Sequence, residues 1–432
     1  FTSGGALRAF RVYSNTLGII DLGKLDLSKI EFEPTHMKSI DMRVNSTKRE
    51  FFSKDKTRPL VWRNLFFPAE ILNAFNARIK TLETYAALFA RNMKRVKKAL
   101  DIAAQKGFDQ QTCSFLRILE GLPAEEKPAF SISTSQPCQQ GERVFADLAR
   151  DMGFEDRFFS LHTPINKDSS YAVEQVAEGL EEAISKMEYA FGEKLDPARL
   201  RNVCELSNQA AEYSQKCNDL RFSSPPLVRC TDALYNAVLF SQLWGCQSLV
   251  DMQKTMYEEL QIKKEWAEKR YSIQDTHRLM WLHLPPFYDT KHLNFIENTC
   301  NAPVVFEEIN YIGWEPLNPM DPIRSLAKKL LATGLLDPKL RIKYIVDCVK
   351  KGKLTGCILY THGFGRCSLA DRPFAKMLRE TLEKIGIPLL ALEGDCVDAS
   401  IDPCSTVTKI ASFVEALNLK RFGNLFGSLL KA

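Results

Sequence analysis

The segment Ala129-Phe-Ser-Ile-Ser-Thr134 is a short apolar run followed by Cys138, and Gly356-Cys-Ile-Leu-Tyr-Thr361 is a similar run followed by Cys367. Runs of this length predict buried strands of a parallel sheet. Loops at the carboxyl ends of such strands converge on the crevice where α/β proteins bind ligands. A third cysteine, Cys113, stands in Gln111-Thr-Cys-Ser-Phe115. Three thiolates that converge in this way can hold an iron–sulfur cluster.

Further apolar runs alternate with helical patterns on both sides of a long helical stretch. Before the stretch, residues 60–62 together with 65–67, then 129–134 and 157–161, predict strands, and Pro68 opens a helix. After it, strands are predicted at residues 278–284, 303–306, 356–361 and 387–392. This alternation is typical of parallel sheets covered by helices. The predicted fold class is α/β, with two Rossmann-like parallel-sheet domains joined by an all-helical segment and separated by a cleft.

Four regions follow from this pattern. Between residues 169 and 270 the apolar positions recur at three- to four-residue spacing, and Pro225-Pro226 marks a break. The predicted divisions are an N-terminal arm or helical extension (1–57), a first α/β cluster-binding domain (58–168), a helical domain (169–275) and a second α/β cluster-binding domain (276–432).

Composition limits the functional class. The chain has 432 residues and is 45% hydrophobic. Its length exceeds the size at which a single hydrophobic core keeps growing, so two or three packed units are expected. The 58 basic and 53 acidic residues leave a net charge of only +5, which argues against a dedicated nucleic-acid surface. The basic residues between Arg91 and Lys98 are expected on a solvated helix face. No apolar run approaches the ~20 residues that span a bilayer, so no membrane partner is expected.

The twelve cysteines are too sparse for a disulfide scaffold in a chain of this length. The sequence starts Phe1-Thr-Ser-Gly-Gly5, without the charged-then-apolar pattern of a signal segment. We therefore expect a reducing cytoplasm, in which free thiols can ligate metal.

Spacing alone does not establish a cluster, because the chain lacks the C-x2-C runs of bacterial ferredoxins. The motifs do resemble a known family. Thr112-Cys-Ser-Phe115, then Pro137-Cys138 followed by Val144-Phe-Ala-Asp-Leu-Ala149, then Arg366-Cys-Ser368, look like the cluster-binding triplet of the 2-hydroxyacyl-CoA dehydratase and benzoyl-CoA reductase superfamily. The segment Gly386-Ile-Pro-Leu-Leu-Ala-Leu-Glu-Gly-Asp-Cys-Val-Asp398 resembles the last strand of the same superfamily. The resemblance covers roughly residues 58–417.

This resemblance implies a [4Fe–4S] cluster in the cleft, with Cys113, Cys138 and Cys367 as metal ligands and one iron open to a CoA-thioester substrate. It implies one-electron chemistry, either dehydration of a 2-hydroxyacyl group or reduction of an aromatic ring. Such chemistry needs a separate ATP-hydrolysing iron–sulfur activator protein. The chain has no G-x-x-x-x-G-K-[ST] phosphate loop, so ATP hydrolysis is expected in that partner. A related sister subunit or a second copy of the chain is also expected.

Other candidate site residues cluster near Cys367. His362 is a candidate catalytic residue, either as a hydrogen-bond donor to the cluster or as a proton donor to the substrate. It fits equally well as a structural histidine that satisfies hydrogen bonds at the end of a strand. Gly363 and Gly365 let the backbone approach a cluster, and Arg366 is a candidate for pairing with a CoA phosphate or with the cluster. Glu70 is a candidate base, although the helix dipole alone favours an acid there.

The chain also departs from the family pattern. Dehydratase subunits tend to carry a small hydroxyl residue before the P-x-E element, where this chain reads Asn64-Leu-Phe-Phe-Pro68. Cys396 and Cys404 are possible additional ligands, which makes a double-cubane [8Fe–9S] reductase of small molecules the alternative. A non-catalytic electron-relay subunit is a second alternative. Asp395 and Asp398 fit either a metal or nucleotide-binding pair or turn caps, with caps preferred.

Overall fold

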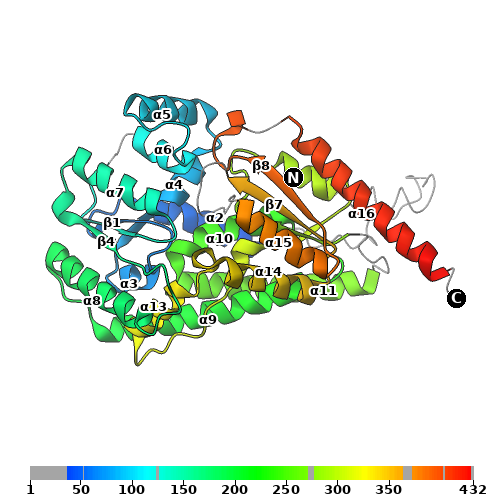
Figure 1. Ribbon diagram of the computed structural model, residues 1–432. Helices are drawn as coiled ribbons and strands as arrows, with labels where there is room; N and C mark the ends of the chain where they lie inside the picture. The colour runs from blue at the N-terminus through cyan, green and yellow to red at the C-terminus, as the bar shows by residue number, and fades with distance from the viewer. Residues whose placement is uncertain are drawn as a thin grey trace, which may run out of the picture.

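The computed structural model describes residues 37–51, 53–122, 126–270, 277–362, 372–401 and 404–429. Its framework is two separate four-stranded sheets, each wholly parallel, with helices around and between them. Figure 1 shows the first sheet near β1 and β4 and the second near β7 and β8, with the green helices passing between the two regions. The expectation of a mixed α/β fold with two parallel sheets is therefore confirmed.

The first sheet has the strand order β2-β1-β3-β4. Its strands are short, and the two central ones are buried along their whole length because helices cover both faces. The strands are β1 (Leu60–Arg63), β2 (Arg78–Thr81), β3 (Phe130–Thr134) and β4 (Phe158–Leu161).

The second sheet repeats this order as β6-β5-β7-β8. Its inner strands are again fully or almost fully buried. The strands are β5 (Leu279–Leu282), β6 (Val304–Glu307), β7 (Gly356–His362) and β8 (Leu389–Gly394).

The shared strand order positions the site. In each sheet the chain runs to one side of the first strand and then crosses to the other side, so the order reverses between β1 and β3 and between β5 and β7. Open α/β sheets bind ligands at the carboxyl ends of the strands that flank such a reversal. The loops that follow β1, β3, β5 and β7 are therefore the expected sources of functional side chains.

Among the helices that follow the strands of the first sheet, α5 is amphipathic and has a conventional N-cap. In α5 the Asn92 side chain accepts a hydrogen bond from the Arg95 amide at 3.2 Å, and Val96, Ala99 and Ala103 are buried while the basic side chains face solvent, as predicted. The helices are α3 (Ala69–Ala74), α4 (Leu82–Phe89), α5 (Met93–Gln105), α6 (Ser114–Gly121) and α7 (Gln139–Met152).

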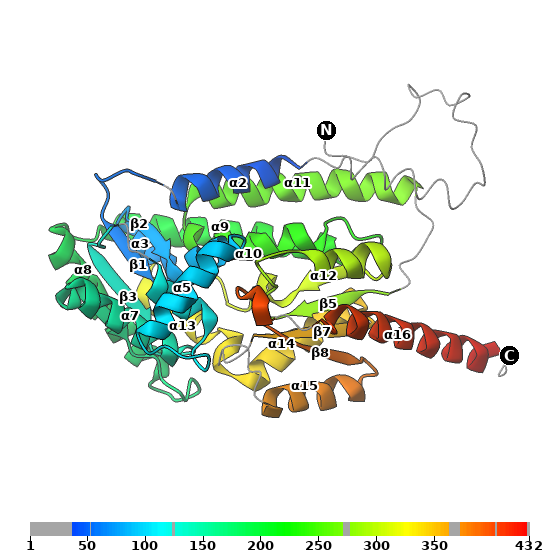
Figure 2. The same cartoon turned by 90° about the horizontal axis from the view of Figure 1, so that it is seen from above.

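Only helices occupy the described residues between 172 and 270. Pro197 begins one of them after the Asp196 cap, whose carboxylate accepts the Ala198 amide at 2.8 Å. Figure 2 shows α2 lying along α11 on one side of the molecule. The helices are α2 (Lys38–Phe51), α8 (Ala172–Phe191), α9 (Pro197–Arg221), α10 (Cys230–Leu243) and α11 (Gln247–Arg270).

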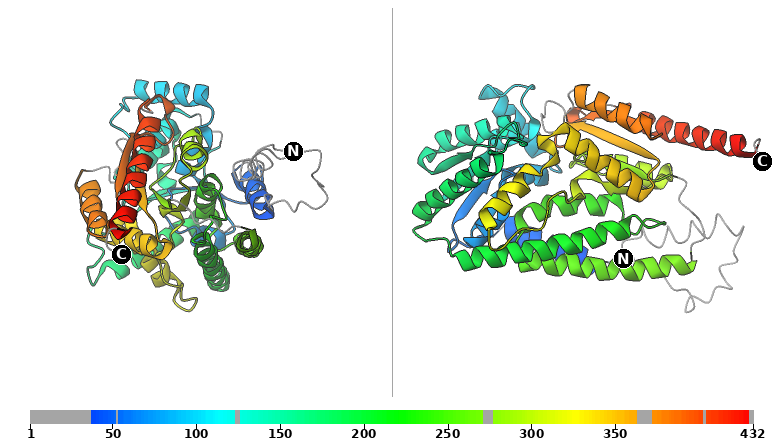
Figure 3. Two further views of the ribbon diagram at one scale, coloured as in Figure 1. Left: turned by 90° about the vertical axis from the view of Figure 1, so that its right-hand side faces the viewer. Right: turned by 60° about the horizontal axis from the view of Figure 1, so that its bottom comes forward.

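Helices α14, α15 and α16 pack against the second sheet, whereas α13 packs on α8 beside the first sheet. Figure 2 and the right-hand view of Figure 3 show α16 extending away from the body toward the C-terminus. Its first part is anchored, since Ile410, Val414 and Leu417 are buried. The helices are α12 (Lys291–Asn294), α13 (Pro322–Leu331), α14 (Pro338–Gly352), α15 (Arg372–Lys384) and α16 (Thr406–Leu429).

The strand prediction for residues 65–67 is wrong, because these residues form the turn between β1 and α3. The edge strand β2 was not predicted, because Arg78-Ile-Lys-Thr81 is half polar. Of the predicted N-terminal arm, residues 1–36 lie outside the described residues, and the rest contains α2. No helix in the described part of the chain is long and apolar enough to cross a membrane.

Candidate functional site

Cys113 and Cys138 occupy equivalent positions, each at the N-cap of a helix. Cys113 caps α6, and Cys138 caps α7 after the loop that leaves β3. The Gly141 amide donates a hydrogen bond to Cys138 Sγ at 3.2 Å, and a Cβ atom added at Gly141 would meet that sulfur at 3.2 Å. The Cys113 amide donates to Gln140 Oε1 at 3.2 Å, which ties the two caps together. Helix N-termini favour negative charge, so both positions suit an anionic sulfur.

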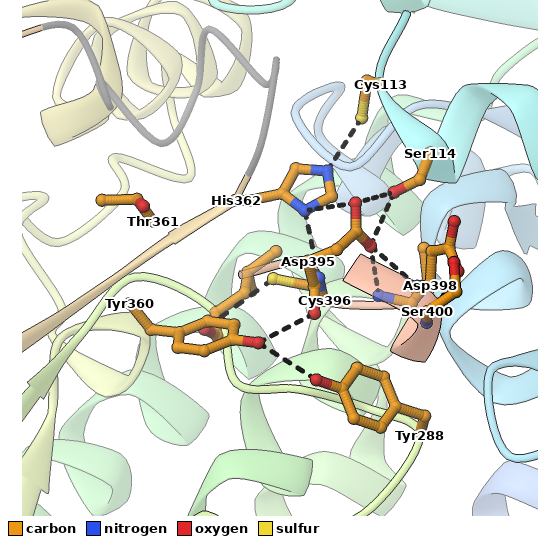
Figure 4. A network of polar contacts seen from close by, with 12 residues as sticks. Cys113, Ser114, Tyr288, Tyr360, Thr361, His362, Asp395, Cys396, Asp398 and Ser400 are labelled. Atoms are coloured by element: carbon orange, nitrogen blue, oxygen red, sulfur yellow. Dashed lines mark hydrogen bonds and ion pairs between the residues drawn. The ribbon is translucent and has the colours of Figure 1, made fainter. Parts of the chain in front are cut away.

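His362 approaches Cys113 from the other half of the molecule. It is the last residue of β7, and its Nε2 lies 3.2 Å from Cys113 Sγ (Figure 4). The Cys396 amide donates to His362 Nδ1 at 3.1 Å, which assigns the ring proton to Nε2, so the imidazole donates to the sulfur. Burial lowers the pKa of His362, and the Asp395 carboxylate offsets this only in part, so the ring is neutral near pH 7.

Asp395 holds the same junction from the end of β8. Its carboxylate accepts hydrogen bonds from Ser114 Oγ at 2.7 and 2.8 Å and from the amides of Val397 and Asp398 at 2.8 and 2.7 Å. Ser114 follows Cys113 directly. Figure 4 therefore shows the N-cap and the first residue of α6 in contact with His362 and Asp395, which lie at the ends of β7 and β8. Asp395 acts as a turn cap, as the sequence favoured, and also fixes the distance between the two halves.

A cavity of about 350 Å³ lies against both cysteines. It draws residues from the segments that follow β1 and β5, from the helical segment and from α13. A volume near the lower end of the usual range for small-ligand sites suits an acyl group and part of its carrier. Among its lining residues are Cys113, Cys138, Leu65, Phe66, Glu70, Glu83, Phe115, Phe240, Trp244, Phe287, Trp314 and Lys329.

Glu70 lies in the first turn of α3 and is completely buried. Ser207 Oγ donates to its Oε1 at 2.7 Å, and Lys329 forms an ion pair with the same oxygen. Burial raises the pKa of Glu70, but Lys329 and Ser207 outweigh this and hold the pKa below its usual range. Glu70 is therefore ionised and paired, which makes it a poor proton acceptor near pH 7.

Glu83 is a second carboxyl group on the cavity, and sequence reasoning missed it. It lies in the first turn of α4, directly after the unpredicted strand β2. Burial raises the pKa of Glu83 to about 7, against the lowering effects of its own amide, Arg63 and the Leu65 amide. Its Oε2 is buried and has no hydrogen-bond partner. A carboxyl that titrates near neutral pH beside a cavity is suited to proton transfer.

The contacts around Cys113 and Cys138 suit part of an iron–sulfur site. Two N-capping cysteines on one cavity wall, with amide and imidazole donors to their sulfurs, fit thiolate ligation. The predicted third ligand, Cys367, and the predicted Gly363, Gly365 and Arg366 lie outside the described residues. Within the described ranges no three His, Cys, Asp or Glu side chains gather as a metal site.

The other cysteines divide by burial. Cys204, Cys217, Cys348 and Cys357 are buried, as expected for core residues. Burial raises the pKa of Cys204 to about 12, which keeps its thiol protonated. Of the possible extra ligands, Cys396 is buried with Sγ 3.9 Å from the Leu284 carbonyl oxygen, and Cys404 is exposed. The unassigned Cys230 is buried, whereas Cys246 and Cys300 are half-buried.

The chain is similar in sequence to known dehydratase subunits. Residues 64–417 match the family model described as 2-hydroxyglutaryl-CoA dehydratase, D-component. The alpha subunit of (R)-2-hydroxyisocaproyl-CoA dehydratase from Clostridioides difficile is 22% identical over 397 residues, which cover 88% of this chain and 95% of that subunit. The alpha subunit of (R)-phenyllactyl-CoA dehydratase from Clostridium sporogenes is 18% identical over 360 residues, 80% of this chain and 86% of that subunit.

Proposed function

The chain belongs to the 2-hydroxyglutaryl-CoA dehydratase D-component family, and from this premise we propose that it is the iron–sulfur subunit of an enzyme acting on a CoA thioester. The reaction is of the 2-hydroxyacyl-CoA dehydratase or benzoyl-CoA reductase type, with electrons from an ATP-hydrolysing activator and with a sister subunit or second copy as partner. The observation that carries the proposal is the pair of N-capping cysteines on the cavity that also contains Glu83.

The proposed ligands are Cys113, Cys138 and Cys367. A [4Fe–4S] cluster held by three thiolates supplies single electrons and one iron with an open coordination position. His362 donates a hydrogen bond to Cys113 Sγ, which stabilises negative charge on that sulfur. Asp395 contacts both Ser114 and His362, which supports a ligand set drawn from both halves of the molecule.

Proton transfer is assigned to Glu83. Its carboxyl changes charge near pH 7, and its Oε2 has no protein partner, so a ligand in the cavity is free to exchange a proton with it. The predicted base, Glu70, is committed to Lys329 and Ser207 and is proposed instead as a fixed charge of the cavity wall. Apolar rings elsewhere in the wall exclude water from the same space.

A single cubane is favoured over the double form. Cys396 contacts the Leu284 carbonyl and is absent from the cavity wall, and Cys404 points to solvent. Counting iron and acid-labile sulfide in anaerobically purified protein tests this, because about four irons per chain indicate one cubane and about eight the double form. The electron-relay alternative predicts a paramagnetic spectrum that a CoA thioester leaves unchanged, whereas the catalytic proposal requires a change.

A further inference from the structure

Two tryptophans form one corner of the cavity. Trp244 follows α10 and Trp314 lies in the loop after η5 (Glu308–Asn310), and their rings meet edge to face with centroids 5.1 Å apart. The Lys329 ammonium lies 4.5 Å from the centre of the Trp244 ring and 4.4 Å from that of Trp314. The ion pair with Glu70 and the two ring faces therefore hold the lysine in place.

The charge of Lys329 is already balanced. Its side chain is only 12% exposed, and Glu70, at 1%, is its carboxylate partner. The second oxygen of Glu70, Oε2, is buried without a hydrogen-bond partner. An acyl group that brought a carboxylate to this corner would meet the Glu70 Oε2 atom, which is itself an acceptor without a donor, rather than a free cation. Burying such an anion is costly.

The other cations on the cavity wall are also committed. Arg63 donates to Thr81 Oγ1 at 3.0 Å and to the carbonyl oxygens of Phe67 and Ser241. Arg221 donates to the buried Glu307 carboxylate at 2.5 Å. Its Nε has no hydrogen-bond partner, which suits a neutral acceptor such as a carbonyl oxygen. Among the described residues of the wall, Lys329 and Arg221 are each paired with a carboxylate, and the guanidinium of Arg63 is committed to neutral oxygens.

The rest of the wall is rich in aromatic rings. Phe66, Phe115, Phe240, Phe287 and Tyr311 line the cavity in addition to the two tryptophans. Phe115 of the first unit meets Phe287 of the second edge to face, with centroids 6.1 Å apart. Edge-to-face and offset contacts favour a further aromatic ring beyond the area that it buries.

From these contacts we propose that the cavity binds the acyl part of a CoA thioester whose acyl group is uncharged and aromatic. Trp244 and Trp314 supply ring contacts, and the Glu70–Lys329 pair rejects acyl groups with a carboxylate. This specificity rests on the proposed function, since it assumes that the cavity is the acyl site of a CoA-thioester enzyme.

The test measures binding of three thioesters to anaerobically purified holoprotein by isothermal titration. Benzoyl-CoA is the aromatic probe, cyclohexanecarbonyl-CoA is an uncharged ring of similar size, and glutaryl-CoA carries a terminal carboxylate. We expect benzoyl-CoA to bind severalfold more tightly than cyclohexanecarbonyl-CoA and at least about tenfold more tightly than glutaryl-CoA. Free CoA serves as the reference for the contribution of the carrier.

Variants of the corner formed by Trp244, Trp314 and Lys329 test whether it causes these differences in affinity. Trp314→Leu should weaken benzoyl-CoA binding and leave cyclohexanecarbonyl-CoA binding nearly unchanged, whereas Trp266→Leu, in α11 and outside the cavity wall, should alter neither. The paired variant Glu70→Gln/Lys329→Met, which removes both charges together, should reduce the discrimination against glutaryl-CoA.

The outcomes are distinguishable. Equal binding of benzoyl-CoA and cyclohexanecarbonyl-CoA to the wild-type protein would refute the aromatic preference without need of any variant. Glutaryl-CoA binding as tightly as benzoyl-CoA would refute the charge argument. In both cases binding of the thioesters leaves the proposed function intact. If none of the three binds more tightly than free CoA, both the specificity and the proposed function are wrong.

Discussion

The imidazole Nε2 of His362 lies 3.2 Å from Cys113 Sγ across 249 residues of sequence. The contact joins the end of a strand in the second sheet to a helix cap of the first unit. It places the end of β7 beside one of the two described candidate ligands. The two halves therefore contribute jointly to whatever is bound between them.

Replacing any one predicted ligand should remove the cluster. Cys113→Ser, Cys138→Ser and Cys367→Ser are each expected to lose iron or to bind it labilely, because a serine oxygen is a poor substitute for thiolate toward iron. Iron analysis after anaerobic purification is the measurement. Cys204→Ser is the matched control, since Cys204 is fully buried elsewhere, and it should keep its iron at a cost of about 1–3 kcal/mol in stability. A variant with full iron content would remove that cysteine from the site.

The extra cysteines should be dispensable. Cys396→Ala and Cys404→Ala are expected to keep the iron content of the wild-type protein, because neither thiol lies on the cavity. The same anaerobic iron analysis applies. Loss of roughly half of about eight irons in either variant would instead establish the double cubane.

His362→Phe should retain the cluster but change its potential. The ring donates a hydrogen bond to Cys113 Sγ, and such bonds raise the potential of a cluster by stabilising its more negative, reduced form. Spectroscopic redox titration should therefore show a lower midpoint potential in the variant, on the order of tens of millivolts. His292→Phe, another buried histidine away from the cavity wall, is the control. An unchanged midpoint in His362→Phe would exclude the hydrogen bond as a tuning contact.

Glu83 should make stability depend on pH near neutrality. Its pKa is raised from 4.5 to about 7 by burial, so the folded state binds the proton more tightly than the unfolded state does. The resulting contribution to the free energy of unfolding is fully present below about pH 4.5 and is lost as the pH rises through about 7. It amounts to up to about 3 kcal/mol. Urea unfolding from pH 5 to 8 should show a steeper decline for the wild-type protein than for Glu83→Gln. Parallel curves for the two proteins would contradict the assignment.

The Glu70–Lys329 pair should behave as a unit. Lys329→Met leaves the buried Glu70 carboxylate without its cation and should cost about 3 kcal/mol or more of unfolding free energy. The double variant Glu70→Gln/Lys329→Met should cost clearly less than the sum of the two single changes, because neither partner is left as a buried unpaired charge. Urea denaturation of the four proteins completes the cycle. Strict additivity would show that the two side chains do not interact.

Several parts of this structure follow from local sequence patterns. The strands β3 and β7 were predictable because their apolar runs are short and bounded by turn residues, and the helical segment because its apolar residues recur every three to four positions. The cap roles of Asp395 and the burial of Cys204 follow from equally local rules.

The missed features depend on distant partners. Glu70 looks like a base in sequence, but Lys329, 259 residues away, neutralises it. Glu83 follows the half-polar strand β2, and nothing near it in the sequence indicates that Arg63 acts on it or that burial raises its pKa. Tertiary burial and long-range pairing decide the roles of both residues, and a single sequence contains no direct record of either.

The repeated strand order gives the molecule an approximate internal symmetry. Residues that follow strands of both sheets line the same cavity, so each half of the molecule supplies only part of the cavity wall. Relative rotation of the halves would change distances across the cavity and leave those within each sheet unchanged. Ser114 contacts Asp395, and Phe287 contacts Phe115, in each case between the two halves. Substitutions at Ser114 or Phe287 should thus impair function far more than they impair the folding of either half.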